Sequence, residues 1–148
     1  SMTRPCLQAS ARCDGGLMTQ AEFIARAVGM PWRKWCATWE ACDCFGLIVL
    51  YFREVRGIDL GEVPQTDIGA GFYAASGWRE CGPIPGQTAF MAWRSGAPTH
   101  CGLIVDGGML LHADGTEGRP GNVRLTRLSV MHRQNQDIRF YSYSEAPC

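Results

Sequence analysis

Residues 43–57 read DCFGLIVLYFREVRG, a run whose apolar side chains recur at helical spacing. Asp43 is a typical N-cap residue and Gly57 is typical of the position just after a helix, so both ends lie within the run. Other apolar residues widen the face, and we therefore expect most of this helix to be buried. The face is built on four residues, Phe45, Ile48, Phe52 and Val55.

The pattern differs on the two sides of this helix. Upstream, Thr19 and Glu22 form a capping box that predicts a short helix ending at Gly29. Downstream, a further helix is indicated near Ile68–Ser76, and then the apolar period changes to two. Helices followed by strands predict an α+β domain with an antiparallel sheet of about five strands. The predicted strands are Thr88–Trp93, His100–Val105, Met109–Ala113, Asn122–Leu125 and Ile138–Tyr143.

The bulk composition predicts one domain and excludes several partners. We expect residues 1–16 to form a flexible N-terminal arm and residues 17–148 to form a single domain. Because 14 basic residues balance 14 acidic ones, no net field favours nucleic acid or an anionic membrane. No apolar run approaches the about 18 residues of a membrane helix, and residues 1–16 show no signal peptide. Ser1 before Met2 resembles the remnant of a cleaved tag.

The cysteine content bears on redox state and on metal binding. Without a signal peptide, reduced thiols are favoured over disulfides. Cys42 and Cys44 are one residue apart and the chain has no CxxC pair, so we expect no metal and no other cofactor. A structural metal held by Cys36 and Cys42 stays open as an alternative. The chain has eight cysteines: Cys6, Cys13, Cys36, Cys42, Cys44, Cys81, Cys101 and Cys148.

Cys44 is the candidate nucleophile because it is the first residue of the predicted central helix. A reactive cysteine needs a depressed thiol pKa, and the N–H groups and positive dipole end of a helix start favour an anion. The same N–H groups offer an oxyanion hole, the set of donors that stabilises a tetrahedral intermediate. For the other cysteines we expect burial without reactivity.

A hairpin predicts how two histidines are placed. A three-residue loop at 106–108 would put His100 and His112 on one face, whereas a two-residue loop would put them on opposite faces. Gly108 suits the left-handed position that ends a three-residue loop, so we expect the shared face. His112 would then lie across from Gly102, which leaves room for its ring. One imidazole would take the thiol proton and the other would orient it.

Three short blocks, in this order and spacing, resemble the NlpC family of papain-like cysteine endopeptidases that cleave bacterial cell-wall peptides. The resemblance covers about residues 20–143. It implies a papain-like fold, with Cys44 as nucleophile, His100 as general base and His112 as third member. It also implies cleavage of a D-glutamyl–diaminopimelate type bond through an acyl-enzyme. The blocks are DCFGL at 43–47, HCGLI at 100–104 and LHA at 111–113.

Other positions are candidates for oxyanion stabilisation or substrate binding. Trp32 stands where family members often have a tyrosine, and it either replaces that hydroxyl or only packs. Asp43 either caps the helix or also binds a substrate amine, and its carboxylate should point away from the sulfur. Phe45 stands where many wall enzymes have serine. Gly102 completes the set, and His132 is expected at the surface.

The DCFGL variant, the short chain and the lack of a signal peptide resemble phage tail-assembly and tail-tip members. The resemblance implies a protein made in the bacterial cytoplasm that acts from the virion tail in the host periplasm. Its partners would be peptidoglycan peptides and phage tail proteins. Two alternatives stay open: a secreted amidase effector or acyltransferase using the same site, and a structural virion module with a cysteine-bound metal.

Overall fold

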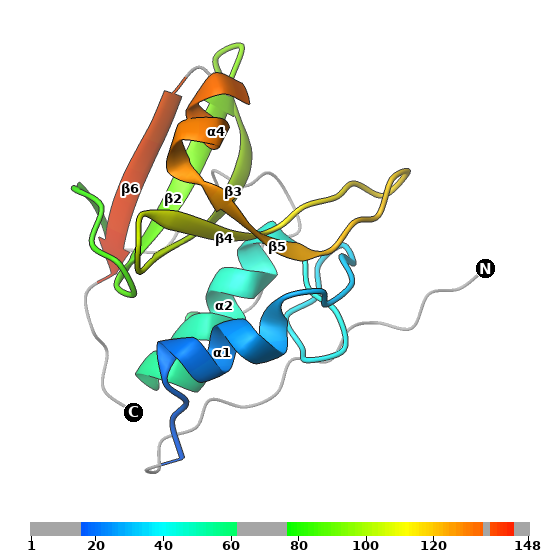
Figure 1. Ribbon diagram of the computed structural model, residues 1–148, viewed down its shortest axis with the longest axis vertical. Helices are drawn as coiled ribbons and strands as arrows, with labels where there is room; N and C mark the ends of the chain where they lie inside the picture. Colours follow the sequence, from blue (N-terminus) through cyan, green and yellow to red (C-terminus); the bar gives the residue numbers. More distant parts are fainter. Residues whose placement is uncertain (1–15, 62–76, 135–136, 144–148) are drawn as a thin grey trace.

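The computed structural model describes residues 16–61, 77–134 and 137–143. Within these residues six strands form one antiparallel sheet in the order β1-β6-β2-β3-β4-β5, with helices on both of its faces (Figure 1). The predicted α+β class is confirmed. The elements are α1 (Gln20–Ala27), α2 (Cys44–Arg56), β1 (Trp78–Cys81), β2 (Thr88–Arg94), β3 (Ala97–Val105), β4 (Met109–Ala113), β5 (Val123–Arg127), α4 (Leu128–Gln134) and β6 (Asp137–Tyr143).

Helix α2 begins and ends at the predicted residues. The Asp43 carboxylate accepts the backbone N–H of Gly46 at 2.7 Å, which caps the helix start. Gly57 ends it in the left-handed conformation at φ 66°, a geometry that glycine adopts without steric cost. The capping box of α1, between Thr19 and Glu22, is also confirmed.

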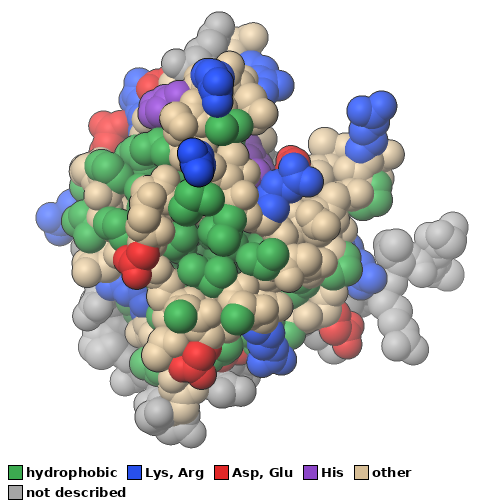
Figure 2. Space-filling model, in the orientation of Figure 1, with side chains coloured by type: hydrophobic (Ala, Val, Ile, Leu, Met, Phe, Trp, Pro, Cys, Tyr) green, Lys and Arg blue, Asp and Glu red, His purple; other side chains and the backbone are tan. Residues whose placement is uncertain are grey.

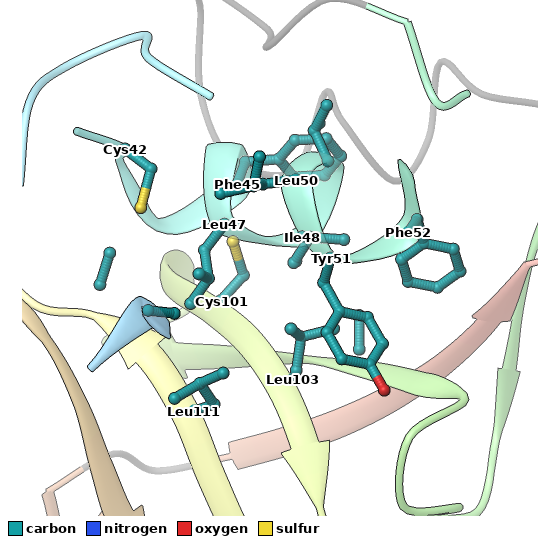
Figure 3. Close-up of a cluster of buried hydrophobic side chains, with 14 of the residues drawn as sticks. Cys42, Phe45, Leu47, Ile48, Leu50, Tyr51, Phe52, Cys101, Leu103 and Leu111 are labelled. Atoms are coloured by element: carbon teal, nitrogen blue, oxygen red, sulfur yellow. The ribbon is translucent and has the colours of Figure 1, made fainter. Parts of the chain in front are cut away.

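Helix α2 packs on one face of the sheet and carries the larger core. Cys101, Leu103 and Leu111 point from β3 and β4 toward Leu47 and its neighbours on α2 (Figure 3). These sheet residues have odd numbers, as side-chain alternation requires for one face. The apolar contact fixes α2 against the middle of the sheet, and with it the position of the helix start.

The opposite face of the sheet is covered by α4. Phe90, Ile104, Leu110 and Phe140 pack there against Met131, in a second and smaller core. Both faces of β3 and β4 are therefore buried, and the strands alternate between two apolar environments. His132 lies on α4 and is exposed, as predicted.

The sequence patterns did not predict strand β1 or helix α4. Strand β1 is a short strand that, among the described residues, pairs with β6 alone, and none of its residues is buried, so its apolar pattern is weak. Helix α4 is shorter than two turns and has a single buried side chain, Met131, so it has no apolar period to detect. In the part of the chain that the structure describes, the sheet consequently has six strands rather than about five.

Some predictions fall outside the described residues. They include the helix near Ile68–Ser76 and, apart from Gly16, the N-terminal arm. The division into arm and domain stays a prediction. None of the described helices is long and apolar enough to cross a membrane.

The expectation of reduced thiols holds for four cysteines and is wrong for Cys36. Cys36 is fully buried and disulfide-bonded. The expectation came from an assumed compartment, whereas pairing is decided by how close two Cβ atoms lie in the fold. The free thiols among the described residues are Cys42, Cys44, Cys81 and Cys101.

Candidate active site

The start of α2 is held by tight backbone contacts. The carbonyl of Cys36 accepts the N–H of Asp43 at 3.1 Å, and a Cβ at Gly46 would overlap that same carbonyl oxygen. The second carboxylate oxygen of Asp43 accepts the N–H of Trp35 at 2.7 Å. Only glycine therefore fits at position 46, and the preceding loop is bound directly to the residue that places Cys44.

Cys44 is half-buried, and its surroundings favour the thiolate. A hydrogen bond from the Cys101 thiol is the largest influence, and a hydrogen bond from His100 and the charge of His100 add to it. Burial acts in the opposite direction, and the pKa of Cys44 nevertheless lies well below its ordinary value. Burial first, and then the neighbouring Cys44 sulfur, raise the pKa of Cys101. Burial likewise raises the pKa of Cys42. Of these three neighbouring thiols, Cys44 is the one poised to ionise.

The hairpin brings the two histidines together. Val105 pairs with Met109, so the loop has three residues, as predicted, and the two imidazoles share a face. His100 Nε2 lies 2.7 Å from His112 Nδ1. A Cβ at Gly102 would come within 2.9 Å of the His112 Cβ and 2.6 Å of the Leu111 carbonyl oxygen, too close for any other residue. The missing side chain at position 102 thus makes the space that the His112 ring needs.

Sequence reasoning missed Thr126. Its hydroxyl lies 2.8 Å from His112 Nε2, the nitrogen that His100 does not contact. The predicted strand Asn122–Leu125 ends two residues before β5 does, so it leaves out Thr126. A threonine in a strand carries no signal of its own. Burial, then the charges of His100 and Arg124, lower the pKa of His112 to about 3, so this ring is neutral near pH 7.

The residues expected to bind substrate lie in different environments. Phe45 is only 5% exposed and belongs to the core under α2. Trp32 is half-buried and packs on Gly115, where a Cβ would lie 2.8 Å from the indole Cγ. Burial, and then the charge of Cys44, raise the pKa of Asp43 to about 7, against its backbone donors. Substrate contacts by these residues and by Gly102 stay a prediction.

One group of side chains among the described residues has the composition of a metal site. His100, His112 and Asp114 offer ligand atoms that all lie within 4.8 Å of one another. An ion bound by both rings would have to replace the hydrogen bond between them. The cysteine-bound metal proposed for Cys36 and Cys42 loses a ligand, because Cys36 is disulfide-bonded.

A buried helix that begins at a cysteine and packs on an antiparallel sheet carrying a histidine pair is typical of the papain-like fold class. The chain belongs to the NlpC/P60 family, whose sequence profile matches residues 29–139.

The chain is also similar to one curated phage protein in sequence and to one solved domain in fold. Tail tip assembly protein K of Escherichia phage N15 is 31% identical, over 47% of this chain and 34% of that protein. The chain therefore spans about a third of the length of this curated relative. The crystal structure of the NlpC/p60 domain of peptidoglycan hydrolase SagA superposes with a TM-score of 0.56 at 18% identity. That alignment covers 86% of this chain and 100% of the SagA domain, and the likeness is one of fold.

Proposed function

We propose that this protein is a cysteine endopeptidase that hydrolyses peptidoglycan stem peptides, at a bond of the D-glutamyl–diaminopimelate type. The observation that carries the proposal is the 2.7 Å contact between His100 and His112 beside a cysteine whose pKa is lowered. Two comparisons support peptidoglycan as the substrate class. The chain belongs to the NlpC/P60 family, and the SagA domain, which has the same fold, is named as part of a peptidoglycan hydrolase.

The proposed reaction is an acyl transfer in two steps. The Cys44 thiolate attacks the scissile carbonyl carbon, and backbone N–H groups at the start of α2 stabilise the oxyanion. His100 gives a proton to the leaving amine as the C–N bond breaks, which leaves a thioester on Cys44. Water then attacks the thioester while His100 accepts a proton, and the carboxylic acid and the thiolate are released. Nε2 of His100 is engaged by His112, so Nδ1 is the nitrogen that exchanges these protons.

The neighbours of His100 decide whether Nδ1 can act as a base. Nδ1 is unprotonated in neutral His100 only when the ring carries its hydrogen on Nε2 and donates it to His112 Nδ1. His112, being neutral, then carries its own hydrogen on Nε2 and donates it to the Thr126 hydroxyl. Thr126, acting as an acceptor, thus selects the tautomer of both rings, and we assign it a positioning role.

The relative from phage N15 supports a place in a virion tail. That protein is named for tail tip assembly, and this chain matches about a third of it. We infer that the present protein is associated with phage tail proteins and acts on the wall from the periplasmic side of the host. Co-purification with tail proteins from virions would test this placement, and its consistent absence from intact virions would count against it.

Digestion of muropeptides by the wild type and by Cys44→Ala tests the proposed activity. We expect Cys44→Ala to lose at least about 1,000-fold in kcat/KM, because the nucleophile is gone. Cys81→Ala is the matched control, since Cys81 is a free thiol on the edge strand β1 and should leave the products unchanged. Equal products from the wild type and Cys44→Ala would sink the proposal. Transfer of the acyl group to an added amine in place of hydrolysis would indicate an acyltransferase.

Alkylation of the cysteines gives a second, independent readout. A thiol of lowered pKa reacts with iodoacetamide at a pH where ordinary thiols are protonated. We expect labelling at pH 5 to be confined to Cys44, and labelling spread evenly over the free thiols would contradict the proposed thiolate. A protein that fails both tests while remaining folded would be a structural tail component.

A further inference from the structure

Cys101 is a thiol that the proposed reaction does not use, and it lies against the nucleophile. It is fully buried on β3 and points from the sheet toward Leu47 on α2 (Figure 3). Its thiol donates a hydrogen bond to the sulfur of Cys44, the first residue of α2. Both thiols are free in this structure. The two sulfur atoms are therefore in direct contact.

The packing of α2 on the sheet holds this contact in place. Cys101 belongs to the larger core together with Leu47, and Cys44 packs against the same core from the helix start. A disulfide needs two Cβ atoms that lie about 3.5–4.5 Å apart, so it forms readily only between cysteines that the fold already places side by side. Because the two thiols touch across a packed interface, a bond between them does not require the helix to leave the sheet.

The two thiols differ in access and in reactivity. Cys44 is half-buried, as is His100, and histidine side chains reach the surface in Figure 2, whereas Cys101 is 0% exposed. The pKa of Cys44 is lowered, while burial and then the Cys44 sulfur raise the pKa of Cys101. Oxidants react with the accessible thiolate and not with a buried, protonated thiol. A small oxidant therefore meets Cys44 first.

Cys42 is the other buried thiol near the nucleophile. It is fully buried and free, two residues before Cys44 in the chain. Burial, the charge of Asp43 and then the charge of Cys44 raise the pKa of Cys42. Cys101, in contrast, interacts with the Cys44 sulfur through a direct hydrogen bond. Cys101 is thus the thiol placed to react with Cys44.

We propose that Cys44 is a site of reversible oxidation by peroxides, and that Cys101 is its resolving cysteine, the thiol that closes a disulfide with the oxidised sulfur. The disulfide would remove the nucleophile and also keep Cys44 from oxidation to sulfinic acid, which thiols do not reverse. A dithiol reductant would restore both thiols by exchange. The inference goes beyond the proposed function and needs no peptidase activity, because it concerns the two thiols alone.

The oxidation proceeds in two steps. The Cys44 thiolate attacks one oxygen of hydrogen peroxide, the O–O bond breaks, and the departing hydroxide takes up a proton to become water. The sulfur is oxidised to a sulfenic acid as the peroxide is reduced. The Cys101 sulfur then attacks the Cys44 sulfur, the S–O bond breaks, and the hydroxyl group leaves as water with the proton of the Cys101 thiol.

Peptide mapping of the oxidised protein tests the link without any activity assay. The wild type is treated with a small molar excess of hydrogen peroxide, the remaining thiols are alkylated after denaturation, and the digest is analysed by mass spectrometry. We expect a cross-linked pair of peptides that contain Cys44 and Cys101, and we expect dithiothreitol to separate them. A Cys44 found only as sulfinic acid, or linked to Cys42 instead, would overturn the inference.

Cys101→Ala removes the resolving thiol, and Cys42→Ala is the matched control, since it removes a second fully buried free thiol. Each variant is compared with its own untreated sample, and the free Cys44 thiol is measured after peroxide and then dithiothreitol. The wild type and Cys42→Ala should recover at least about 5-fold more Cys44 thiol than Cys101→Ala, in which the sulfenic acid passes on to sulfinic acid. Equal recovery in all three proteins would overturn the inference.

Muropeptide digestion separates this inference from the proposed function. A protein that forms and reverses the Cys44–Cys101 disulfide but never cleaves muropeptides would refute the peptidase and leave the oxidation site standing. A peptidase that peroxide inactivates irreversibly, with no link between Cys44 and Cys101, would refute the oxidation site and leave the peptidase standing.

Discussion

The start of α2 and the β3–β4 hairpin place the two halves of the candidate site by different means. At the helix start, Asp43, Cys44 and Gly46 lie within four residues, and one carboxylate caps the helix and holds the loop before it. In the hairpin, His100 and His112 are twelve residues apart and meet only because the loop has three residues and Gly102 has no side chain. The nucleophile is placed by local structure, and the histidine pair by strand register.

This difference decides what a mutation can disturb. Register is fixed by many cross-strand contacts, so single changes in the hairpin should alter the chemistry more than the fold. The helix start depends on a few close backbone contacts, so changes there should alter the fold as well. The predictions below test this contrast, ordered from the largest expected effect to the smallest.

His112→Ala should lower kcat/KM for muropeptides about 1,000-fold, a loss of about 4 kcal/mol in transition-state stabilisation. Without His112, nothing orients the His100 ring or accepts its Nε2 hydrogen. His112→Asn retains a side-chain acceptor and should recover part of the rate. Steady-state kinetics with a folding check by thermal unfolding measure both variants. A fully active His112→Ala would mean that His100 needs no third member.

Gly46→Ala should lower the free energy of unfolding by about 3 kcal/mol, because the added methyl overlaps the Cys36 carbonyl. The loop and the helix start would have to separate, which also displaces Cys44. Gly118→Ala is the control, since a Cβ there meets nothing within 4 Å. Denaturant unfolding monitored by tryptophan fluorescence would measure both. If the two variants were equally stable, the close approach at Gly46 would be unimportant.

The same contrast explains what the sequence could predict. The α2 boundaries, the capping box of α1 and the three-residue hairpin follow from caps, period and turn chemistry, and all are confirmed. The contact of Thr126 with His112 could not be predicted, because it depends on β5 lying beside β4. Pairing between strands distant in sequence leaves no local pattern. The disulfide of Cys36 was not predicted for a similar reason, since its formation depends on the distance between two cysteine Cβ atoms in the folded chain.

The buried His112 should make the stability depend on pH. Its pKa is lowered to about 3 in the folded protein, against about 6.5 in the unfolded chain, so protons bind the unfolded chain more tightly. The contribution of His112 to the free energy of unfolding is fully present above about pH 6.5, and it is lost as the pH falls toward 3. Between pH 7 and pH 5 the expected loss is about 2 kcal/mol.

Asp43 opposes this trend, because burial raises its pKa to about 7 and acid therefore favours the folded state through that group. The His112 share is isolated by comparing the wild type with His112→Asn in denaturant unfolding at pH 7 and pH 5. The wild type should lose about 2 kcal/mol more than the variant over this interval. Identical pH dependence in the two proteins would refute a depressed pKa at His112.

Thr126→Val should have the smallest effect, about a 10-fold fall in kcat/KM with little change in KM, because it removes one hydrogen bond and no catalytic group. Without the hydroxyl, His112 is free to carry its hydrogen on Nδ1 and donate it to His100. That arrangement places the His100 hydrogen on Nδ1, where a base must be unprotonated. Thr126→Ser should restore the rate. Thr99→Val removes a hydroxyl that donates to the backbone carbonyl of Ala92, and it should leave the rate unchanged. If Thr126 had only a structural role, Thr126→Val and Thr126→Ser would have the same kcat/KM and would differ only in their unfolding temperature. Rescue by serine at equal stability would therefore assign the effect to the tautomer of the histidine pair, the half of the site that strand register builds.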